Sequence, residues 1–241
     1  MNVGKGAKIH LIILYNIIMK IFGFGTLPST NTYAVEHFNN FENQDIIMAE
    51  TQAAGKGRKG RKWSSETGGL YFTIILKPSE IKAEKASSLT QIMAIAVCKA
   101  VKKLGVKAYL KWPNDVLYKG KKFCGILSEA VIDGADFKGL VIGVGVNIKQ
   151  KNIVSERPFT TLADIGVKVS KSVLVEDIIS NFETVQKQNF IDEFKRLCPT
   201  INTEIIVNGK KGIFEDIDSA GRMILKTEKG REVIMAGDVQ F

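Results

Sequence analysis

Residues 108–148 read AYLKWPNDVLYKGKKFCGILSEAVIDGADFKGLVIGVGVNI and have the most regular β pattern in the sequence. Their apolar runs are separated by the turn sequences KGK and DGAD, which supply the glycine and aspartate that tight hairpins favour. This stretch therefore predicts an antiparallel meander. Upstream of it, the runs Gln44–Gln52 and Leu70–Leu76 predict two further strands.

Helical periodicity lies in other parts of the chain. Apolar residues at helical spacing predict a helix over Lys82–Leu104, which Gly105 ends. Ser172 is expected to cap a second amphipathic helix, and Phe190–Leu197 predicts a short third helix that ends at Pro199. After this proline, short β runs are separated by the turns NGK, DSAG and EKG, which predicts a small barrel. The fold class is therefore α+β, a mixed or antiparallel sheet with helices followed by a small β-barrel.

A basic loop, QAAGKGRKGRKW (Gln52–Trp63), connects two of the predicted strands. Its glycines allow the backbone N–H groups to approach an anion closely, and its five Lys and Arg residues supply the countercharge for a phosphate-bearing ligand. A dense basic run is also typical of a nucleic-acid patch, a localisation signal or a solvated loop. The letters GKGRKG match the dinucleotide fingerprint, but that motif requires a helix directly after it, and here a polar turn and a strand follow.

Composition limits the function only broadly. The 241 residues are 45% hydrophobic and 24% charged, enough for one sizeable core and a small appendage. The formal net charge of +9 favours anionic partners, which include nucleotides, nucleic acid and acidic carrier domains. The widely spaced Cys98, Cys124 and Cys198 do not form a convincing zinc site with only two histidines in the chain. We therefore expect reduced cysteines and no metal ligands.

The N-terminal segment could be read as a secretory signal, because LIILYNIIM (Leu11–Met19) follows basic residues. However, Asn16 interrupts the apolar run, no small-residue cleavage site precedes Lys20, and the run is shorter than the ~20 residues of a membrane span. We expect residues 1–18 to be an upstream extension, with a natural start at Met19. A cytoplasmic protein without a membrane partner is the expectation.

Four segments in this order resemble the catalytic domain of the biotin protein ligases: LPSTNTYA (Leu27–Ala34), the basic loop, Leu110–Ala130 and Leu140–Ile148. The resemblance implies a catalytic domain over residues 19–198 that makes biotinyl-5′-AMP from biotin and ATP with Mg²⁺. It also implies transfer of biotin to a lysine of a biotin carboxyl carrier domain of a biotin-dependent carboxylase. Residues 199–241 resemble the SH3-like C-terminal domain of the same family.

The resemblance also implies site residues. Those expected to bind biotin are Ser29, Thr30, Asn31, Gln52, Lys56, Gly57, Arg58, Trp63 and Lys122. Those expected to bind the nucleotide are Arg58, Arg61, Trp63, Asn114 and Asn147, the last by reading an adenine edge. The expected catalytic residues are Arg58, Lys122 and Asp115, with Asp115 accepting a proton from the carrier lysine or orienting it.

Each of these motifs has a plainer interpretation from local chemistry. Ser29, Thr30 and Asn31 could simply cap a helix, Lys122 could be a solvated charge after a hairpin, and Asn114 and Asp115 could form a turn. Two departures from the family pattern matter as well. The chain reads GKGR where many relatives read GRGR, so Lys56 keeps the charge but loses the bidentate fork of arginine. A basic residue that often follows the last strand of the family and reaches the nucleotide phosphates is missing before Phe241.

Some alternatives stay open at this stage. Residues 149–166 look like the family's second loop over the nucleotide, but their sequence singles out no contact residue. The 28 residues before Ser29 are fewer than the ~50 of a small DNA-binding domain, so no DNA partner is expected, and a possible homodimer is left open. The alternative functions are a lipoate or octanoyl ligase, a basic nucleic-acid-binding module, and an ATP-independent adaptor for biotinylated carriers. A nucleic-acid module would need aromatic residues interleaved with the cations, and the loop offers only Trp63.

Overall fold

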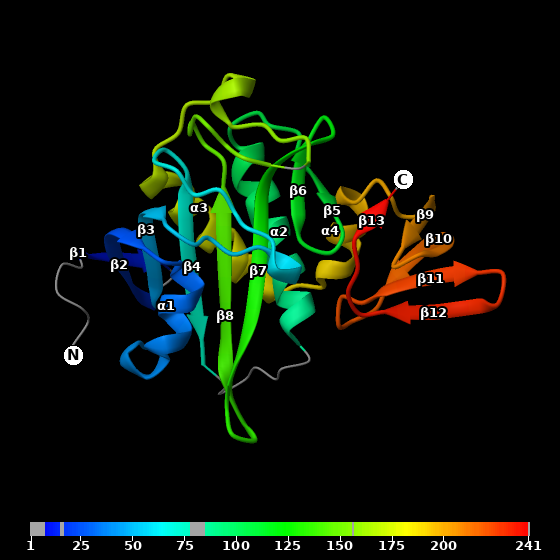
Figure 1. The fold of residues 1–241 in the computed structure, drawn as a ribbon, viewed down its shortest axis with the longest axis horizontal. Helices are drawn as coiled ribbons and strands as arrows, with labels where there is room; N and C mark the ends of the chain where they lie inside the picture. The colour runs from blue at the N-terminus through cyan, green and yellow to red at the C-terminus, as the bar shows by residue number, and fades with distance from the viewer. Residues whose placement is uncertain (1–7, 15–16, 78–84, 156, 241) are drawn as a thin grey trace.

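The computed structural model describes residues 8–14, 17–77, 85–155 and 157–240. Figure 1 shows a large sheet with helices packed on it, and a smaller sheet at one side that leads to the C-terminus. The large sheet has the strand order β1-β2-β3-β4-β8-β7-β6-β5. Within it, β2 and β3 are parallel and the other neighbouring strands are antiparallel. The predicted α+β class with a mixed sheet is confirmed.

The strands of the large sheet are β1 (Lys8–Leu14), β2 (Ile17–Leu27), β3 (Ile46–Gln52), β4 (Leu70–Leu76), β5 (Tyr109–Lys111), β6 (Asp115–Tyr118), β7 (Lys121–Asp133) and β8 (Asp136–Val146). The last four form the predicted meander. Its hairpins turn at Gly120 and Gly134, whose φ angles of 79° and 60° lie in the left-handed region that tight hairpins require. The local turn chemistry thus sets the pairing of these strands.

Four α-helices accompany the described strands: α1 (Thr30–Glu36), α2 (Ala86–Lys102), α3 (Lys171–Gln186) and α4 (Phe190–Leu197). In the view of Figure 1, α2 and α3 lie behind the sheet, and the cyan loop after β3 passes in front of it. Strand β8 explains this arrangement, because successive residues of a strand point to opposite faces. Ile142, Val144 and Val146 belong to the core that includes α2 and α3. Gly143 and Gly145 therefore face the other side.

The structure corrects two expected element boundaries. An upstream extension was expected over residues 1–18, but β1 lies within it, and β2 begins at Ile17 and pairs over residues 17–23 with β1. Helix α3 is capped by Ser170 rather than Ser172, because the Ser170 Oγ accepts a hydrogen bond from the Val173 N–H at 3.3 Å. Ser172 lies inside the first helical turn. Residues 82–84 of the helix predicted over Lys82–Leu104 lie outside the described residues.

The smaller sheet contains β9 (Glu204–Val207), β10 (Lys210–Ile217), β11 (Met223–Thr227), β12 (Gly230–Ile234) and β13 (Val239–Gln240), in the order β12-β11-β10-β9-β13. It packs onto the large unit through Trp112. The Trp112 ring lies 6.4 Å from that of Phe214, and its Nε1–H donates to the Gly221 carbonyl at 3.1 Å. The predicted domain boundary at residues 198–199 falls between α4 and β9. Among the helices of the described ranges, none is long and apolar enough to cross a membrane.

Candidate functional site

A cavity of about 530 Å³ opens on the sheet face that carries Gly143 and Gly145. This volume is typical of small-molecule sites. The cavity is lined by all of the residues expected at the site: Ser29, Thr30, Asn31, Gln52, Lys56, Gly57, Arg58, Arg61, Trp63, Asn114, Asp115, Lys122 and Asn147. Segments that are far apart in the sequence are therefore brought to one hollow of the sheet.

The floor of the cavity is made of glycines on paired strands. Gly125 of β7 and Gly145 of β8 are register partners. A Cβ atom at Gly145 would lie 2.4 Å from Nε1 of Trp63, and a Cβ at Gly125 would lie 3.0 Å from the same indole. The missing side chains let a planar group pack closely against the sheet, and that group is the Trp63 indole. Its buried Nε1–H has no hydrogen-bond partner among the residues that the structure describes.

The STN segment enters the cavity at the start of α1, where the Ser29 Oγ accepts from the Thr32 N–H at 3.4 Å. The Thr30 N–H donates to Gln52 Oε1 at 2.8 Å. Gln52 Nε2 in turn donates to the Ser65 Oγ at 2.7 Å. These bonds orient the amide of Gln52 and join the STN segment to the end of β3.

Asn31 is held by two residues that sequence analysis missed. Its Oδ1 lies 2.7 Å from the hydroxyl of Thr73, and its Nδ2 donates to Glu129 Oε2 at 2.7 Å. Thr73 is fully buried on β4, and the only available signal was a threonine within the apolar run Leu70–Leu76. Both ends of the Asn31 amide are thus engaged by the protein itself, which holds the segment rigidly against the sheet.

The basic loop closes on itself as a tight hairpin. The Gly57 N–H donates to the Arg61 carbonyl at 2.7 Å, and Lys56 and Lys62 form an isolated β-bridge. At its tip, Lys59 and Gly60 adopt positive φ angles of 55° and 72°. Among the described residues that line the cavity, seven are Lys or Arg and one carries a carboxylate. The excess of positive charge around a low-dielectric hollow favours a polyanionic ligand.

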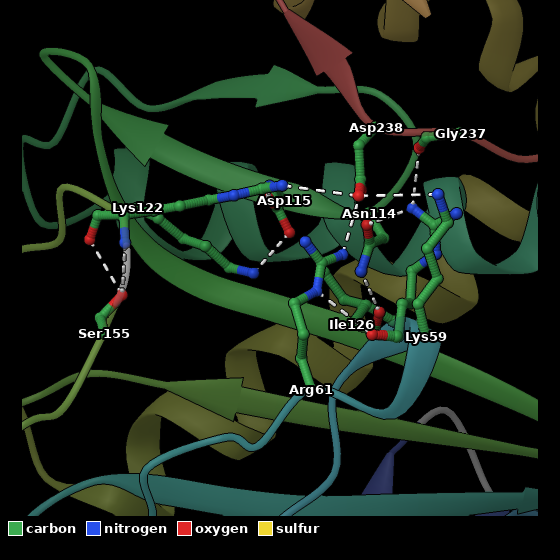
Figure 2. A network of polar contacts seen from close by, with 11 residues as sticks. Lys59, Arg61, Asn114, Asp115, Lys122, Ile126, Ser155, Gly237 and Asp238 are labelled. Atoms are coloured by element: carbon green, nitrogen blue, oxygen red, sulfur yellow. Dashed lines mark hydrogen bonds and ion pairs between the residues drawn. The ribbon is translucent and has the colours of Figure 1, made fainter. Parts of the chain in front are cut away.

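The smaller sheet reaches the basic loop through the turn before β13. Arg58 donates from one guanidinium nitrogen to Asn114 Oδ1 at 3.1 Å and to the Gly237 carbonyl at 3.2 Å. The Asp238 carboxylate lies 3.0 Å from Arg61 Nη2 and 3.7 Å from Lys59 Nζ (Figure 2). The C-terminal unit therefore contacts the loop with a carbonyl and an acid, where the family pattern led us to look for a base.

Burial and nearby charges shift the pKa values of Arg58 and Asp238 in opposite directions. Desolvation by burial lowers the pKa of Arg58, against the opposing effects of Asp238 and Asp115. Burial alone would raise the pKa of Asp238, but the hydrogen bond from Arg61 and the charges of Arg61, Arg157 and Lys59 outweigh it, so that the pKa is lowered. Asp238 is thus held as an anion among the cations of the loop.

Lys122 and Asp115 form the central ion pair of the cavity, with Lys122 Nζ 2.6 Å from Asp115 Oδ1. The same ammonium lies 5.0 Å from the centre of the Trp63 ring. A second loop is anchored beside this pair. The Lys122 N–H donates to the Pro158 carbonyl at 3.0 Å, and the Thr160 N–H donates to the Lys122 carbonyl at 3.0 Å. The second loop was expected over the nucleotide, and this pairing sets it at the start of β7.

Asn147 lies at the junction of β8 and the second loop. Its Nδ2 donates to the Thr160 carbonyl at 3.3 Å, and its Oδ1 accepts from Gln150 Nε2 at 2.8 Å. It lines the cavity, but both ends of its amide are engaged within the protein. Arg157 and Phe159 of the second loop also line the cavity, and sequence analysis singled out neither.

The described residues contain no group of three His, Cys, Asp or Glu side chains that could hold a metal ion. Cys98, Cys124 and Cys198 are free and buried. Burial raises the pKa of each thiol, so the protonated, unreactive form is favoured.

Comparisons with known proteins cover both units of the chain. Residues 23–147 match the family described as Biotin/lipoate A/B protein ligase, and residues 200–241 match the Biotin protein ligase C terminal domain. The chain is 29% identical over 236 residues to the biotin–[acetyl-CoA-carboxylase] ligase of Paracoccus denitrificans, covering 88% of this chain and 97% of the relative. It is 28% identical over 230 residues to the bifunctional ligase/repressor BirA of Escherichia coli, covering 89% and 72%.

A similar solved structure is the biotin protein ligase from Aquifex aeolicus in complex with biotin and ATP. The two structures have a TM-score of 0.77 and 26% sequence identity, over 91% of this chain and 97% of the Aquifex chain.

Proposed function

The chain belongs to the biotin/lipoate A/B protein ligase family, and we infer that it is a biotin protein ligase. It activates biotin with ATP to biotinyl-5′-AMP and then transfers the biotinyl group to a lysine of a biotin carboxyl carrier protein. The match of residues 200–241 to the C-terminal domain of biotin protein ligases separates this function from lipoate or octanoyl transfer. The observation that carries the inference is a glycine-floored cavity with the cationic loop at its edge.

In the first step, the carboxylate of biotin attacks the α-phosphorus of ATP. A C–O–P mixed anhydride forms, and the bond to the β-phosphate oxygen breaks, so that pyrophosphate leaves. Arg58 and Lys122 line the cavity beside the reacting groups and offset the charge that develops on the phosphate oxygens. No covalent nucleophile is needed from the protein, because positioning two bound reactants lowers most of the barrier.

We propose that Mg²⁺ enters with ATP. Magnesium in such sites is held mainly by substrate phosphates and water, with one or two carboxylates. Asp115 is the one carboxylate among the described lining residues. Its Oδ1 pairs with Lys122, and its Oδ2, which lies 4.0 Å from Arg157 Nη1, is the oxygen that such a contact would use. The cation would offset charge on the departing pyrophosphate.

In the second step, the amine of the carrier lysine attacks the acyl carbon of the adenylate, the acyl–oxygen bond breaks and AMP leaves. The anhydride reacts readily with water, so the basic loop must stay closed until the carrier arrives. We propose that Asp115 acts chiefly by orienting Lys122, since its carboxylate lies 2.6 Å from that ammonium. Deprotonation of the carrier lysine by Asp115 would require this pair to open.

The test is to incubate the purified chain with biotin, Mg-ATP and a carrier domain, and to weigh the carrier by mass spectrometry. We expect a gain of one biotinyl group that depends on ATP. If the carrier gained mass only with lipoate, the substrate would be lipoate and not biotin. Binding of biotinylated carrier without adenylate formation would reduce the protein to an adaptor.

We propose the carrier domain of a biotin-dependent carboxylase as the protein partner, because relatives are named biotin–[acetyl-CoA-carboxylase] ligases. A cytoplasmic location and a possible homodimer stay predictions. Sedimentation of the free and biotin-bound protein would test the dimer.

A further inference from the structure

Arg157 is a cation of the cavity that neither the sequence motifs nor the comparisons assign to a ligand. It lines the cavity from the second loop, a segment separate in sequence from the basic loop at residues 52–63. Its backbone is anchored next to β7, because the carbonyl of the next residue, Pro158, accepts a hydrogen bond from the Lys122 N–H at 3.0 Å. The Arg157 N–H also lies 3.2 Å from the Ser155 Oγ, which donates back to the Arg157 carbonyl at 2.9 Å.

The guanidinium of Arg157 lies between two carboxylates. Arg157 Nη2 is 3.5 Å from Asp238 Oδ2, and Nη1 is 4.0 Å from Asp115 Oδ2. The Asp238 carboxylate is shared with Arg61 and Lys59 of the basic loop. Three cations that line the cavity, from two separate segments, thus converge on one acid. Figure 2 shows Asp238 between the basic loop and the segment of Ser155.

These contacts are exposed enough to exchange. The side chain of Arg157 is 42% exposed and that of Asp238 is 25% exposed, and the greatest contrast is with Asp115, which is 11% exposed. Ion pairs near solvent contribute little net stability, so breaking one costs little. A phosphate offers more charge than a carboxylate and accepts bidentate hydrogen bonds from a guanidinium.

We propose that Arg157 binds the β- and γ-phosphates of ATP, and the pyrophosphate formed from them, by exchanging Asp238 for phosphate oxygens. The proposal rests on the proposed function, since it takes ATP as the ligand. Lys122 and Arg58 lie deeper, beside Asp115 and Asn114, where the biotin carboxylate and the α-phosphate must meet. Arg157, Arg61 and Lys59 form the outer set, at the place of the outer phosphates. Asp238 keeps these cations together in the nucleotide-free protein.

The experiment compares Arg157→Gln with Lys151→Gln, which removes the same charge from an exposed position of the same loop outside the cavity lining. Biotin-dependent ATP–pyrophosphate exchange gives the KM for ATP and for biotin, and chromatography gives the retention of biotinyl-AMP. For Arg157→Gln we expect a rise of about tenfold in the KM for ATP, which corresponds to the loss of one charge-assisted hydrogen bond. The KM for biotin and the retention of biotinyl-AMP should stay at the parent values, because neither molecule has outer phosphates.

Arg157→Lys should recover part of the affinity for ATP, since lysine keeps the positive charge but not the bidentate hydrogen bonding of a guanidinium. Lys151→Gln should behave as the parent. An unchanged KM for ATP in a folded Arg157→Gln protein would overturn the proposal. If Arg157→Gln lost biotinyl-AMP as strongly as it lost affinity for ATP, Arg157 would act in loop closure and not in phosphate binding. If Lys151→Gln raised the KM for ATP as much as Arg157→Gln, the effect would come from the net charge of the loop and not from a contact of Arg157. Calorimetry of inorganic pyrophosphate binding to all four proteins needs no turnover. It tests Arg157 even if the parent forms no adenylate, a result that would instead overturn the proposed function.

Discussion

Lys122 Nζ lies 2.6 Å from Asp115 Oδ1, although Asp115 opens β6 and Lys122 stands near the start of β7. The pair is more than a surface contact, because the Asp115 side chain is 11% exposed and both side chains line the cavity. Lys122 could have been an ordinary charge after a hairpin turn. The ion pair instead directs its ammonium along the cavity wall, 5.0 Å from the centre of the Trp63 ring.

We expect Lys122→Ala to weaken biotin binding by about 1.5–3 kcal/mol, the usual worth of a hydrogen bond to a charged group. Calorimetry with biotin measures the effect. The matched control is Lys121→Ala, which removes an exposed lysine from the neighbouring position and should leave the affinity unchanged. Equal biotin affinity in folded Lys122→Ala and parent proteins would show that Lys122 does not contact biotin.

Gly145→Ala should displace the Trp63 indole, because the new Cβ would lie 2.4 Å from its Nε1. Overpacking of this kind costs about 1–3 kcal/mol, so biotin affinity should fall on the order of tenfold. The tryptophan emission should shift as the indole leaves its site. Gly25→Ala is the control, since a Cβ there meets nothing within 4 Å. Unchanged emission and affinity in Gly145→Ala would mean that the strand moves to make room.

Arg58→Gly should separate making the adenylate from holding it. Arg58 ties the basic loop to Asn114 and to the Gly237 carbonyl, and its loss frees the loop from both. We expect pyrophosphate release to continue while biotinyl-AMP escapes and modifies lysines on bystander proteins. Free biotinyl-AMP is followed by chromatography alongside carrier labelling. A variant that forms no adenylate would place Arg58 in the first step, and one that retains it fully would make the loop contacts unimportant.

A chain shortened to begin at Met19 should still fold and ligate biotin, because β2 remains paired with β3 and the cavity residues begin at Ser29. Loss of β1 exposes the backbone edge of β2, so we expect lower stability and more self-association. Each kcal/mol lost should lower Tm by about 2–4 °C for a domain of this size. Loss of adenylate formation in a folded shortened chain would show that β1 supports the site.

Glu183→Gln should stabilise the protein at neutral pH. Burial raises the pKa of Glu183 above its ordinary 4.5, so its ionised form is disfavoured in the folded state. Relative to the ionised form, protonated Glu183 favours folding. This contribution to the free energy of unfolding is complete at pH values below the ordinary pKa of 4.5 and is lost as the pH rises through the raised pKa. The Tm difference between variant and parent should therefore grow as pH rises from the acid range towards 7. The matched control is Glu176→Gln, which removes the same charge from an exposed position of the same helix, α3.

Much of the fold follows from local pattern. The meander of β5 to β8 was predictable because glycines mark its hairpin turns and apolar runs lie between these turns. The structure places the turn glycines in the left-handed region. The expected site residues came from a resemblance carried by four motifs in a specific order, and all of them line one cavity. Their contacts with biotin and the nucleotide stay predictions. The helix start at Ser170 was missed, since two serines two residues apart offer the same capping chemistry and only the hydrogen bond to Val173 distinguishes them.

The sequence alone therefore determined the basic loop and the strands from β3 to β8, because these depend on neighbours within a few positions. Tertiary structure decided the contacts between distant segments. Arg61 and Asp238 are 177 positions apart, and Thr73 and Asn31 are 42 apart. No periodicity or turn signal encodes such pairs, since they form only when packing against a shared core brings their strands and loops together.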